Sequence, residues 1–287
     1  MVSGSTTENQ KKRRPFIIPI FLPHAGCPHQ CVFCNQESIT GKKDNVISAR
    51  QLQSRVEAFL KYNSKQRRPV QIAFFGGNFL GQKTETVKML LEEATKCVVR
   101  GAADSIRFST RPDTIDRQQL ALIQNYPVSA IELGVQSMDP GVLKTSRRGH
   151  TNLDTEYAVD LLNECHYDIG VQIMIGLPGD NSDTMMKTGQ RVAHLKPHFV
   201  RIYPTLVIQG SPLATWYHEG KYRPMSLETA VSRVKDLYLL FHKAGIPVIR
   251  MGLQHEEGFD DPETILAGPY HPAFGHLVYA EIFFDRV

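Results

Sequence analysis

The sequence predicts an α/β fold, a TIM-like partial (β/α)6 barrel of parallel strands with a small C-terminal extension. Two observations predict it. Six apolar runs typical of buried strands alternate with amphipathic helical stretches between residues 15 and 210. Polar or glycine-rich clusters follow the C-terminal ends of these strands, which is where barrel enzymes build their active sites. Periodicity leaves an open doubly wound sheet as the alternative.

The first half of the predicted barrel begins with the apolar run 15–22, which a cysteine-rich loop follows. Ser48 and Gln51 form a capping-box pattern that begins a helix over residues 48–62. Two further units of strand and helix come next. Their strands are expected at 70–75 and 105–110, and their helices at 84–99 and 116–125.

The second half continues the alternation and then loses it. The expected strands are residues 130–136, 169–175 and 199–206, and the expected helices are residues 153–165 and 183–195. From residue 211 the order changes, with a helix expected at 226–243, a strand at 246–253 and a turn-rich loop at 268–275. We therefore expect a barrel over residues 15–210 and a C-terminal extension over 211–287 packed on it.

Composition excludes some classes of protein. The chain has 287 residues, which suits one barrel, and its 33 basic and 29 acidic residues give a net charge of +4, too little to indicate nucleic-acid binding. Residues 1–14 lack apolar periodicity and end in Lys11-Lys12-Arg13-Arg14, which predicts a disordered basic leader. The sequence shows neither a membrane span nor a signal peptide. We expect a soluble, cytoplasmic protein without membrane contact.

Three of the five cysteines, Cys27, Cys31 and Cys34, fall in one loop with CxxxCxxC spacing. An odd set of neighbouring cysteines is a poor disulfide framework, but its thiolates can share one metal centre. A cubane iron-sulfur cluster usually takes four thiolates, so three ligands leave one iron open to another molecule. A zinc site completed by His24 or His29 is the alternative.

This loop resembles that of the radical S-adenosylmethionine (SAM) superfamily, including an aromatic residue, Phe33, just before the third cysteine. The resemblance implies an enzyme of partial-barrel fold with a 4Fe-4S cluster on Cys27, Cys31 and Cys34. It also implies that SAM binds the open iron and is cleaved reductively, giving methionine and a 5'-deoxyadenosyl radical. An electron donor such as ferredoxin or flavodoxin would reduce the cluster.

Further motifs lie where the superfamily binds SAM. Gly76-Gly77-Asn78 resembles the glycine motif that receives the SAM amino group, although Asn78 replaces the usual acidic or threonine residue. Glu132 and Gln136 share one strand face and would meet ribose, with an internal ion-pair network as the alternative for Glu132. The other expected cofactor contacts are Phe33, Ser109, Thr110, Arg148 for the SAM carboxylate, and Ile175 and Gly176 for adenine.

Five stretches resemble one subgroup, the radical SAM part of the elongator-complex catalytic subunit and its short bacterial relatives. They are residues 109–113, 132–137, 148–151, 203–208 and 268–272. Elongator subunits carry a following acetyltransferase domain, for which this chain has no length left, so acetyl transfer is not carried over. The resemblance makes tRNA the candidate substrate.

The sequence does not identify the substrate. Substrate contacts are expected at Tyr203, Gln209, Tyr270 and His271, in loops near the sixth strand and the C-terminus. One alternative is an RNA-binding module with a structural or vestigial cluster, using Arg67, Arg68 and Arg147 on phosphates. Another is a radical SAM protein that acts on porphyrin precursors. The oligomeric state stays open.

Overall fold

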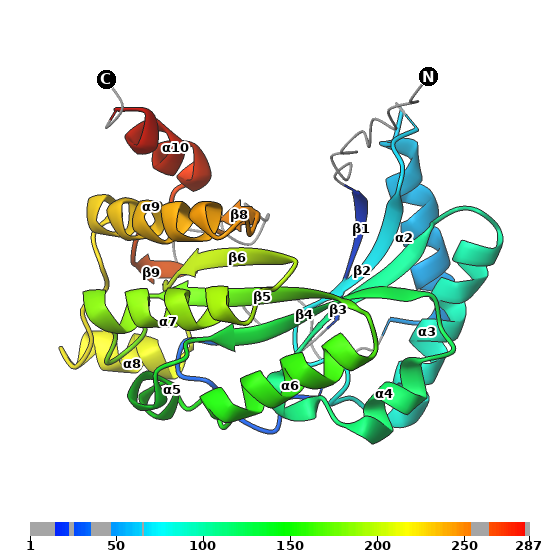
Figure 1. Ribbon diagram of the computed structural model, residues 1–287, viewed down its shortest axis with the longest axis horizontal. Coiled ribbons are helices and arrows are strands. Elements are labelled where there is room, and N and C mark those ends of the chain that lie inside the picture. The colour runs from blue at the N-terminus through cyan, green and yellow to red at the C-terminus, as the bar shows by residue number, and fades with distance from the viewer. Residues whose placement is uncertain (1–14, 23–25, 36–46, 65, 254–263, 285–287) are drawn as a thin grey trace, which may run out of the picture.

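The computed structural model describes residues 15–22, 26–35, 47–64, 66–253 and 264–284 (Figure 1). A seven-stranded parallel sheet with strand order β1-β2-β3-β4-β5-β6-β8 lies at its centre. The strands are β1 (Phe16–Phe21), β2 (Val70–Phe75), β3 (Ser105–Thr110), β4 (Val128–Gln136), β5 (Asp168–Ile175), β6 (Phe199–Pro204) and β8 (Val248–Met251). The α/β prediction is therefore confirmed. The strands curl into a half-barrel, with β1 and β8 at its two edges.

Helices cover the outer face of this half-barrel (Figure 1). Those that connect consecutive strands are α2 (Ala49–Lys61), α3 (Thr84–Val99), α4 (Arg117–Ile123), α6 (Asn152–Glu164), α7 (Ser182–His194) and α9 (Leu227–Lys243). Their ends follow the local sequence. The capping box of Ser48 and Gln51 begins α2 as predicted, and Thr151 with Asp154 makes another at α6.

The sheet has one strand more than the six expected. The strand predicted within the extension is β8, which pairs in parallel with β6 and matches Val248 to Val200. A sixth strand at the sheet edge would leave a row of unpaired backbone groups, and β8 satisfies them. The segment after residue 211 therefore completes the half-barrel as well as packing on it.

Short helices replace three stretches that the sequence left as loops or untyped. They are α5 (Pro140–Thr145), α8 (Pro212–His218) and α10 (Phe274–Phe284), and a short 3-10 helix η1 spans Pro112–Thr114. In α5 and α8 an N-cap side chain and a proline begin a helix too short to show periodicity. Helix α10 is apolar on most sides and packs on α9, where the rings of Tyr238 and Tyr279 lie 5.4 Å apart.

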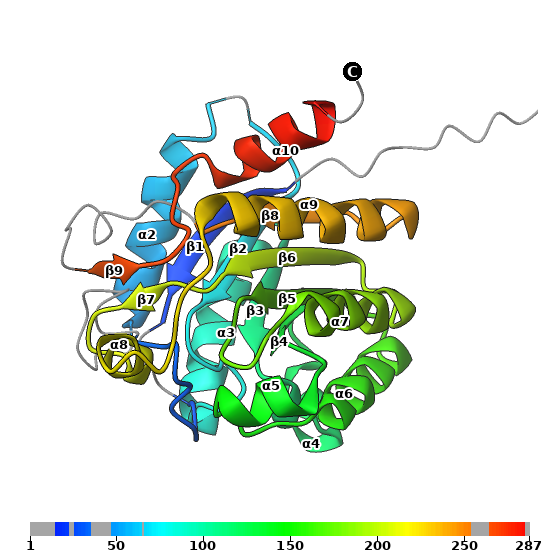
Figure 2. The same cartoon turned by 90° about the vertical axis from the view of Figure 1, so that its left-hand side faces the viewer.

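A second, two-stranded sheet stands beside the barrel mouth. It pairs β7 (Val207–Ile208) with β9 (Ile265–Ala267) in antiparallel fashion, and α8 packs on β7 (Figure 2). Three of its side chains, Val207, Leu266 and Ala267, contribute to a small apolar cluster with Val32 of the cysteine loop and Leu213. The C-terminal segment therefore supports the cysteine loop.

Two further predictions concern the N-terminal leader and membrane spans. The disordered leader predicted for residues 1–14 lies outside the described residues. No helix within the described ranges combines the length and apolar composition that crossing a bilayer requires.

Candidate active site

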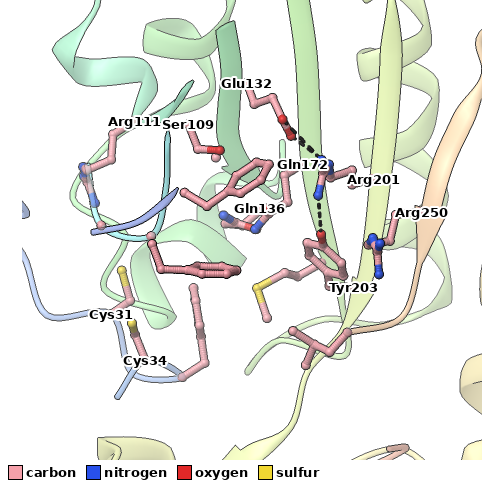
Figure 3. A pocket seen from close by; sticks show the side chains of 18 of the residues that line it. Cys31, Cys34, Ser109, Arg111, Glu132, Gln136, Gln172, Arg201, Tyr203 and Arg250 are labelled. Atoms are coloured by element: carbon pink, nitrogen blue, oxygen red, sulfur yellow. Dashed lines mark hydrogen bonds and ion pairs between the residues drawn. The ribbon is translucent and has the colours of Figure 1, made fainter. Parts of the chain in front are cut away.

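A cavity of about 490 Å³ opens at the C-terminal ends of the barrel strands. Its lining includes the last residue of each of β1 to β4, namely Phe21, Phe75, Thr110 and Gln136. Figure 3 shows the cysteines on one side of the cavity and polar side chains of β4, β5, β6 and β8 across from them. This is the end of a parallel α/β barrel at which active sites are built.

Cys27, Cys31 and Cys34 all line this cavity as free cysteines. Burial raises the pKa of the Cys27 thiol and neighbouring Cys31 adds to the rise, while Arg111 and Arg148 lower it. The loop is anchored by main-chain hydrogen bonds, from Val32 N to the Ser146 carbonyl over 3.2 Å and from Leu213 N to the Val32 carbonyl over 2.8 Å. Three thiols are thus presented together in a partly dehydrated site.

The described residues contain no group of three His, Cys, Asp or Glu side chains arranged around a single metal ion. A cubane cluster requires a different arrangement, because each thiolate binds a separate iron. Of the two histidines suggested for zinc, His24 lies outside the described residues, and His29 is exposed with its ring against Gly149. Three free thiols on one cavity wall fit the donor set of a cubane cluster.

Two arginines flank the cysteines. The Nη1 atom of Arg148 donates a hydrogen bond to the Sγ atom of Cys31 over 3.1 Å, and the Nη2 atom donates to the Gly134 carbonyl. Arg111 pairs with Asp113 at 2.9 Å and also donates to the carbonyl of Arg148. Both guanidinium groups are held in place, and both stabilise negative charge on sulfur.

Asn78 joins the cysteine loop to the end of β3. Its side chain is fully buried, and its Nδ2 atom donates to the Gly26 carbonyl over 3.0 Å. Its Oδ1 atom accepts from the Thr110 hydroxyl at 2.6 Å and from Arg111 N at 3.1 Å. Asn78 itself does not line the cavity, so it acts as a brace beneath it.

The adjoining glycines do line the cavity. Gly76 and Gly77 have φ of +83° and +52°, which only glycine adopts readily, and a Cβ at Gly76 would lie 2.6 Å from the Leu22 carbonyl oxygen. The turn therefore brings bare main chain to the cavity beside the end of β1.

Glu132 and Gln136 differ in their surroundings. The Glu132 carboxylate forms ion pairs with Arg107 at 2.6 Å and Arg201 at 2.8 Å, which is the ion-pair network that the sequence left open. Gln136 has a positive φ of +70° and accepts a hydrogen bond from Gln172 over 3.3 Å. Both residues line the cavity.

Comparison with known families identifies this arrangement. Residues 21–192 match the Radical SAM superfamily, and residues 197–283 match the Radical_SAM C-terminal domain. The chain belongs to the radical SAM superfamily. This match over residues 21–192 assigns the chain to the radical SAM class of enzymes.

Curated relatives share about a quarter of the sequence. An uncharacterized protein of Methanocaldococcus jannaschii is 27% identical over 81% of this chain and 74% of its own length. The tRNA uridine(34) acetyltransferase of Dehalococcoides mccartyi is 25% identical over 75% of this chain and 54% of its own length. Elongator complex protein 3 of Danio rerio is 26% identical over 62% of this chain and 34% of its own length. The radical SAM chain thus spans about half or less of the acetyltransferase and elongator proteins it matches.

Solved structures share the fold. Elp3 of the archaeon Methanocaldococcus infernus superposes with a TM-score of 0.73 at 20% identity, covering 94% of this chain and 63% of that one. Streptococcus suis SuiB bound to S-adenosylmethionine gives 0.57 at 13% identity, covering 87% and 50%. TsrM from Kitasatospora setae, solved with a [4Fe-4S] cluster and cobalamin, gives 0.52 at 15% identity, covering 72% and 39%.

The structure brings together most of the cofactor contacts predicted from sequence. Phe33, Gly76, Gly77, Ser109, Thr110, Glu132, Gln136 and Arg148 line the cavity with the three cysteines. Ile175 and Gly176 do not. Ile175 is buried in the hydrophobic core, and Gly176 lines a separate hollow in which Tyr222 donates to the Gly176 carbonyl over 2.7 Å. The structure thus places the turn that was assigned to adenine outside the cavity lining.

Of the four predicted substrate residues, Tyr203 alone is part of the cavity lining in the described structure. Gln209 accepts a hydrogen bond from Asn35 at its carbonyl over 2.7 Å, and His271 accepts one from Ala273 N over 3.0 Å. Neither they nor Tyr270 is among the residues that line the cavity.

Sequence reasoning missed Gln172, Arg201 and Arg250, which also line the cavity. Each is a polar residue within an apolar strand, and they match across β5, β6 and β8 in the pairs Gln172↔Arg201 and Arg201↔Arg250. A polar side chain at an inward-facing position of a buried strand was the available signal.

Proposed function

We propose that this radical SAM enzyme binds a 4Fe-4S cluster through Cys27, Cys31 and Cys34 and cleaves SAM reductively beside it. The observation that carries the proposal is that all three free thiols share one cavity with the Gly76-Gly77 turn and the Arg148 guanidinium. When bound, the cluster and SAM would together supply the 5'-deoxyadenosyl radical chemistry that removes hydrogen from a substrate. The protein binds and orients the partners and excludes water.

The residues divide this work between them. Main-chain groups at Gly76 and Gly77 suit the SAM amino group, because no side chain obstructs approach. Arg148 suits the carboxylate, since its Nε atom is buried without a hydrogen-bond partner among the described residues. Gln136 and Ser109, with the Phe33 ring nearby, suit the ribose and adenine because they line the same cavity.

We further propose tRNA as the substrate and a ferredoxin or flavodoxin as the electron donor, with the enzyme in the cytoplasm. The named tRNA uridine(34) acetyltransferases among its relatives support tRNA. Exposed Arg147, 5.7 Å from the Trp216 ring in a cation-π contact, lies one residue from Arg148 at the cavity and offers a phosphate contact near the mouth.

The test is anaerobic reconstitution with iron and sulfide, followed by SAM and dithionite and quantification of 5'-deoxyadenosine. The parent is expected to bind iron and sulfide and to form 5'-deoxyadenosine. Variants with Cys27→Ala, Cys31→Ala or Cys34→Ala are expected to lose both, whereas Cys165→Ala, an exposed cysteine outside the cavity, retains both. Zinc in place of iron in the parent, or unchanged product from any of the three variants within the CxxxCxxC loop, would refute the proposal.

The substrate is tested separately. Adding tRNA to the reduced, SAM-loaded parent is expected to raise 5'-deoxyadenosine formation and to yield a modified nucleoside by mass spectrometry. Binding of tRNA without any product, at full cluster loading, would favour the RNA-binding alternative.

A further inference from the structure

The cavity wall formed by β6 and β8 carries two arginines side by side. Arg201 and Arg250 are partners in the register of this strand pair, and both side chains line the cavity. Paired residues that line the same cavity from neighbouring strands lie close together, because adjacent strands run about 4.8 Å apart, and like charges so placed repel each other. The two neighbouring positive charges of this wall therefore favour the binding of an anion.

The carboxylate within this wall is already engaged. Glu132 pairs with Arg107 and with Arg201, and its side chain is 4% exposed. Two guanidinium groups therefore share one negative charge before Arg250 is considered. In the part of the chain that the structure describes, the Arg250 guanidinium has no ion pair or hydrogen bond. A half-buried arginine without a carboxylate partner retains its full capacity to bind one.

The position of Arg250 indicates a ligand other than the cofactor. Figure 3 shows Cys31 and Cys34 on one side of the cavity and Arg250 with Tyr203 on the other. The cysteine side has its own guanidinium groups, Arg111 and Arg148. Arg250 is therefore left for a second molecule in the same cavity.

Tyr203 adds a donor to this wall. It lies two residues beyond Arg201 on the same strand face, and its hydroxyl accepts a hydrogen bond from Arg201 Nη1 over 3.2 Å. The phenol proton therefore stays available to an incoming acceptor. The Phe75 ring lies 5.1 Å from the Arg201 guanidinium, and Met174 and Leu253 line the cavity nearby, so water is partly excluded and charge interactions are strengthened.

We propose that Arg250 and Tyr203 bind an oxyanion of the substrate, a carboxylate or a phosphate, and hold the substrate across the cavity from the cysteines. The planar guanidinium can bind either group through two parallel hydrogen bonds. The proposal rests on the proposed function in one respect, that this cavity is the reaction chamber, and it adds the charge of the substrate group bound there.

The test measures binding to the full chain by isothermal titration calorimetry at low ionic strength, without SAM or reductant. The probes are inorganic phosphate, acetate, uridine 5'-monophosphate and, as the uncharged comparison, uridine. Arg250→Gln is expected to weaken binding of the preferred anion about ten- to a hundredfold, as loss of a charge-assisted hydrogen bond does. Arg250→Lys keeps the charge and is expected to lose less affinity.

Arg117→Gln is the matched control, because it removes the same charge at an exposed pair with Glu164 outside the cavity. It should bind every probe as the parent does. Circular dichroism of Arg250→Gln checks that the variant is folded, and Tyr203→Phe, which removes only the hydroxyl, gives a second, milder loss.

The outcomes separate the two sources of the oxyanion. Tight, Arg250-dependent binding of phosphate and uridine 5'-monophosphate supports a phosphate, and the same dependence for acetate supports a carboxylate. The inference would be overturned if the parent bound no anion, or if Arg250→Gln bound the anions as tightly as the parent does. It would also be overturned if the parent bound uridine and uridine 5'-monophosphate equally and did not bind acetate. Since no SAM cleavage is measured, failure of the proposed function would show only in the separate 5'-deoxyadenosine assay.

Discussion

Arg148 and Cys31, which are 117 positions apart in the chain, are joined by a hydrogen bond of 3.1 Å from guanidinium to sulfur. The same guanidinium donates to the Gly134 carbonyl in β4, and its Nε atom is buried without a partner in the described structure. The Arg148 side chain thus connects the cysteine loop to the sheet, and its Nε–H group can still donate a hydrogen bond to a ligand. An arginine here does more than supply charge.

We expect Arg148→Lys to keep the cluster but to weaken SAM binding about tenfold. Lysine retains the positive charge near sulfur but cannot reproduce several donors in a fixed plane. Iron content after reconstitution measures the first effect, and equilibrium dialysis with SAM measures the second. Arg147→Lys, at the exposed neighbouring position, should change neither. Full SAM affinity in Arg148→Lys would contradict the role assigned to the Nε donor.

Asn78→Ala should lower the free energy of unfolding by about 1–3 kcal/mol, because it leaves the buried main-chain N–H of Arg111 without its acceptor and removes one of the partners of the Thr110 hydroxyl. It should also slow cluster assembly, since the Gly26 carbonyl loses its anchor. Urea denaturation of the protein before reconstitution gives the first quantity, and the rate of iron uptake gives the second. Asn163→Ala, at an exposed position of α6, is the control. Assembly at the parental rate in Asn78→Ala would mean that the brace is dispensable.

Glu132→Gln should lower the free energy of unfolding by about 3–5 kcal/mol, because two buried guanidinium groups would lose their common counter-charge. The matched control is Glu164→Gln, whose partner Arg117 is 74% exposed, and its effect should stay below about 1 kcal/mol. Chemical denaturation of both variants at neutral pH makes the comparison. Similar losses in the two would show that burial does not distinguish these ion pairs.

The sequence was sufficient for the parts of the site that depend on short motifs. The spacing of Cys27, Cys31 and Cys34 and the paired glycines at 76 and 77 are local patterns, and all five residues lie at one cavity. The alternation of strands and helices similarly predicted six of the seven barrel strands, because buried parallel strands are continuous apolar runs.

The parts that the sequence could not supply depend on which strands become neighbours. Strand β8 was recognisable as a strand, but its pairing with β6 arises from an open sheet edge and not from a local pattern. For the same reason Arg250 could not be associated with Arg201 before the register was known. Ile175 and Gly176 lie at the C-terminal end of β5, where cavity residues are expected, yet Tyr222 from a later segment donates a hydrogen bond to the Gly176 carbonyl.

His150 should make stability depend on pH. Its Nε2 atom donates to the Val135 carbonyl over 3.2 Å, and its Nδ1 atom is buried without a partner in the described residues. Burial first, and then the charges of Arg148 and Arg111, lower its pKa from 6.5 to about 3. Below pH 6.5 the unfolded chain therefore binds a proton at His150 that the folded chain does not bind. The contribution of His150 to the free energy of unfolding is complete above pH 6.5 and decreases as the pH falls to about 3.

The measurement compares the parent with His150→Asn in urea between pH 7.5 and 4.5. Asp180, whose pKa is raised by burial to about 6, acts in the opposite direction and is present in both proteins, so the difference between them isolates His150. Between pH 6 and 4.5 the parent should lose stability relative to the variant by about 1.4 kcal/mol per pH unit, the slope for one proton. The two profiles should run parallel above pH 7, where the imidazole is neutral in both states. Parallel profiles down to pH 4.5 would mean that folded His150 accepts the proton, and that the arginines beside the cysteine loop do not exclude a further positive charge.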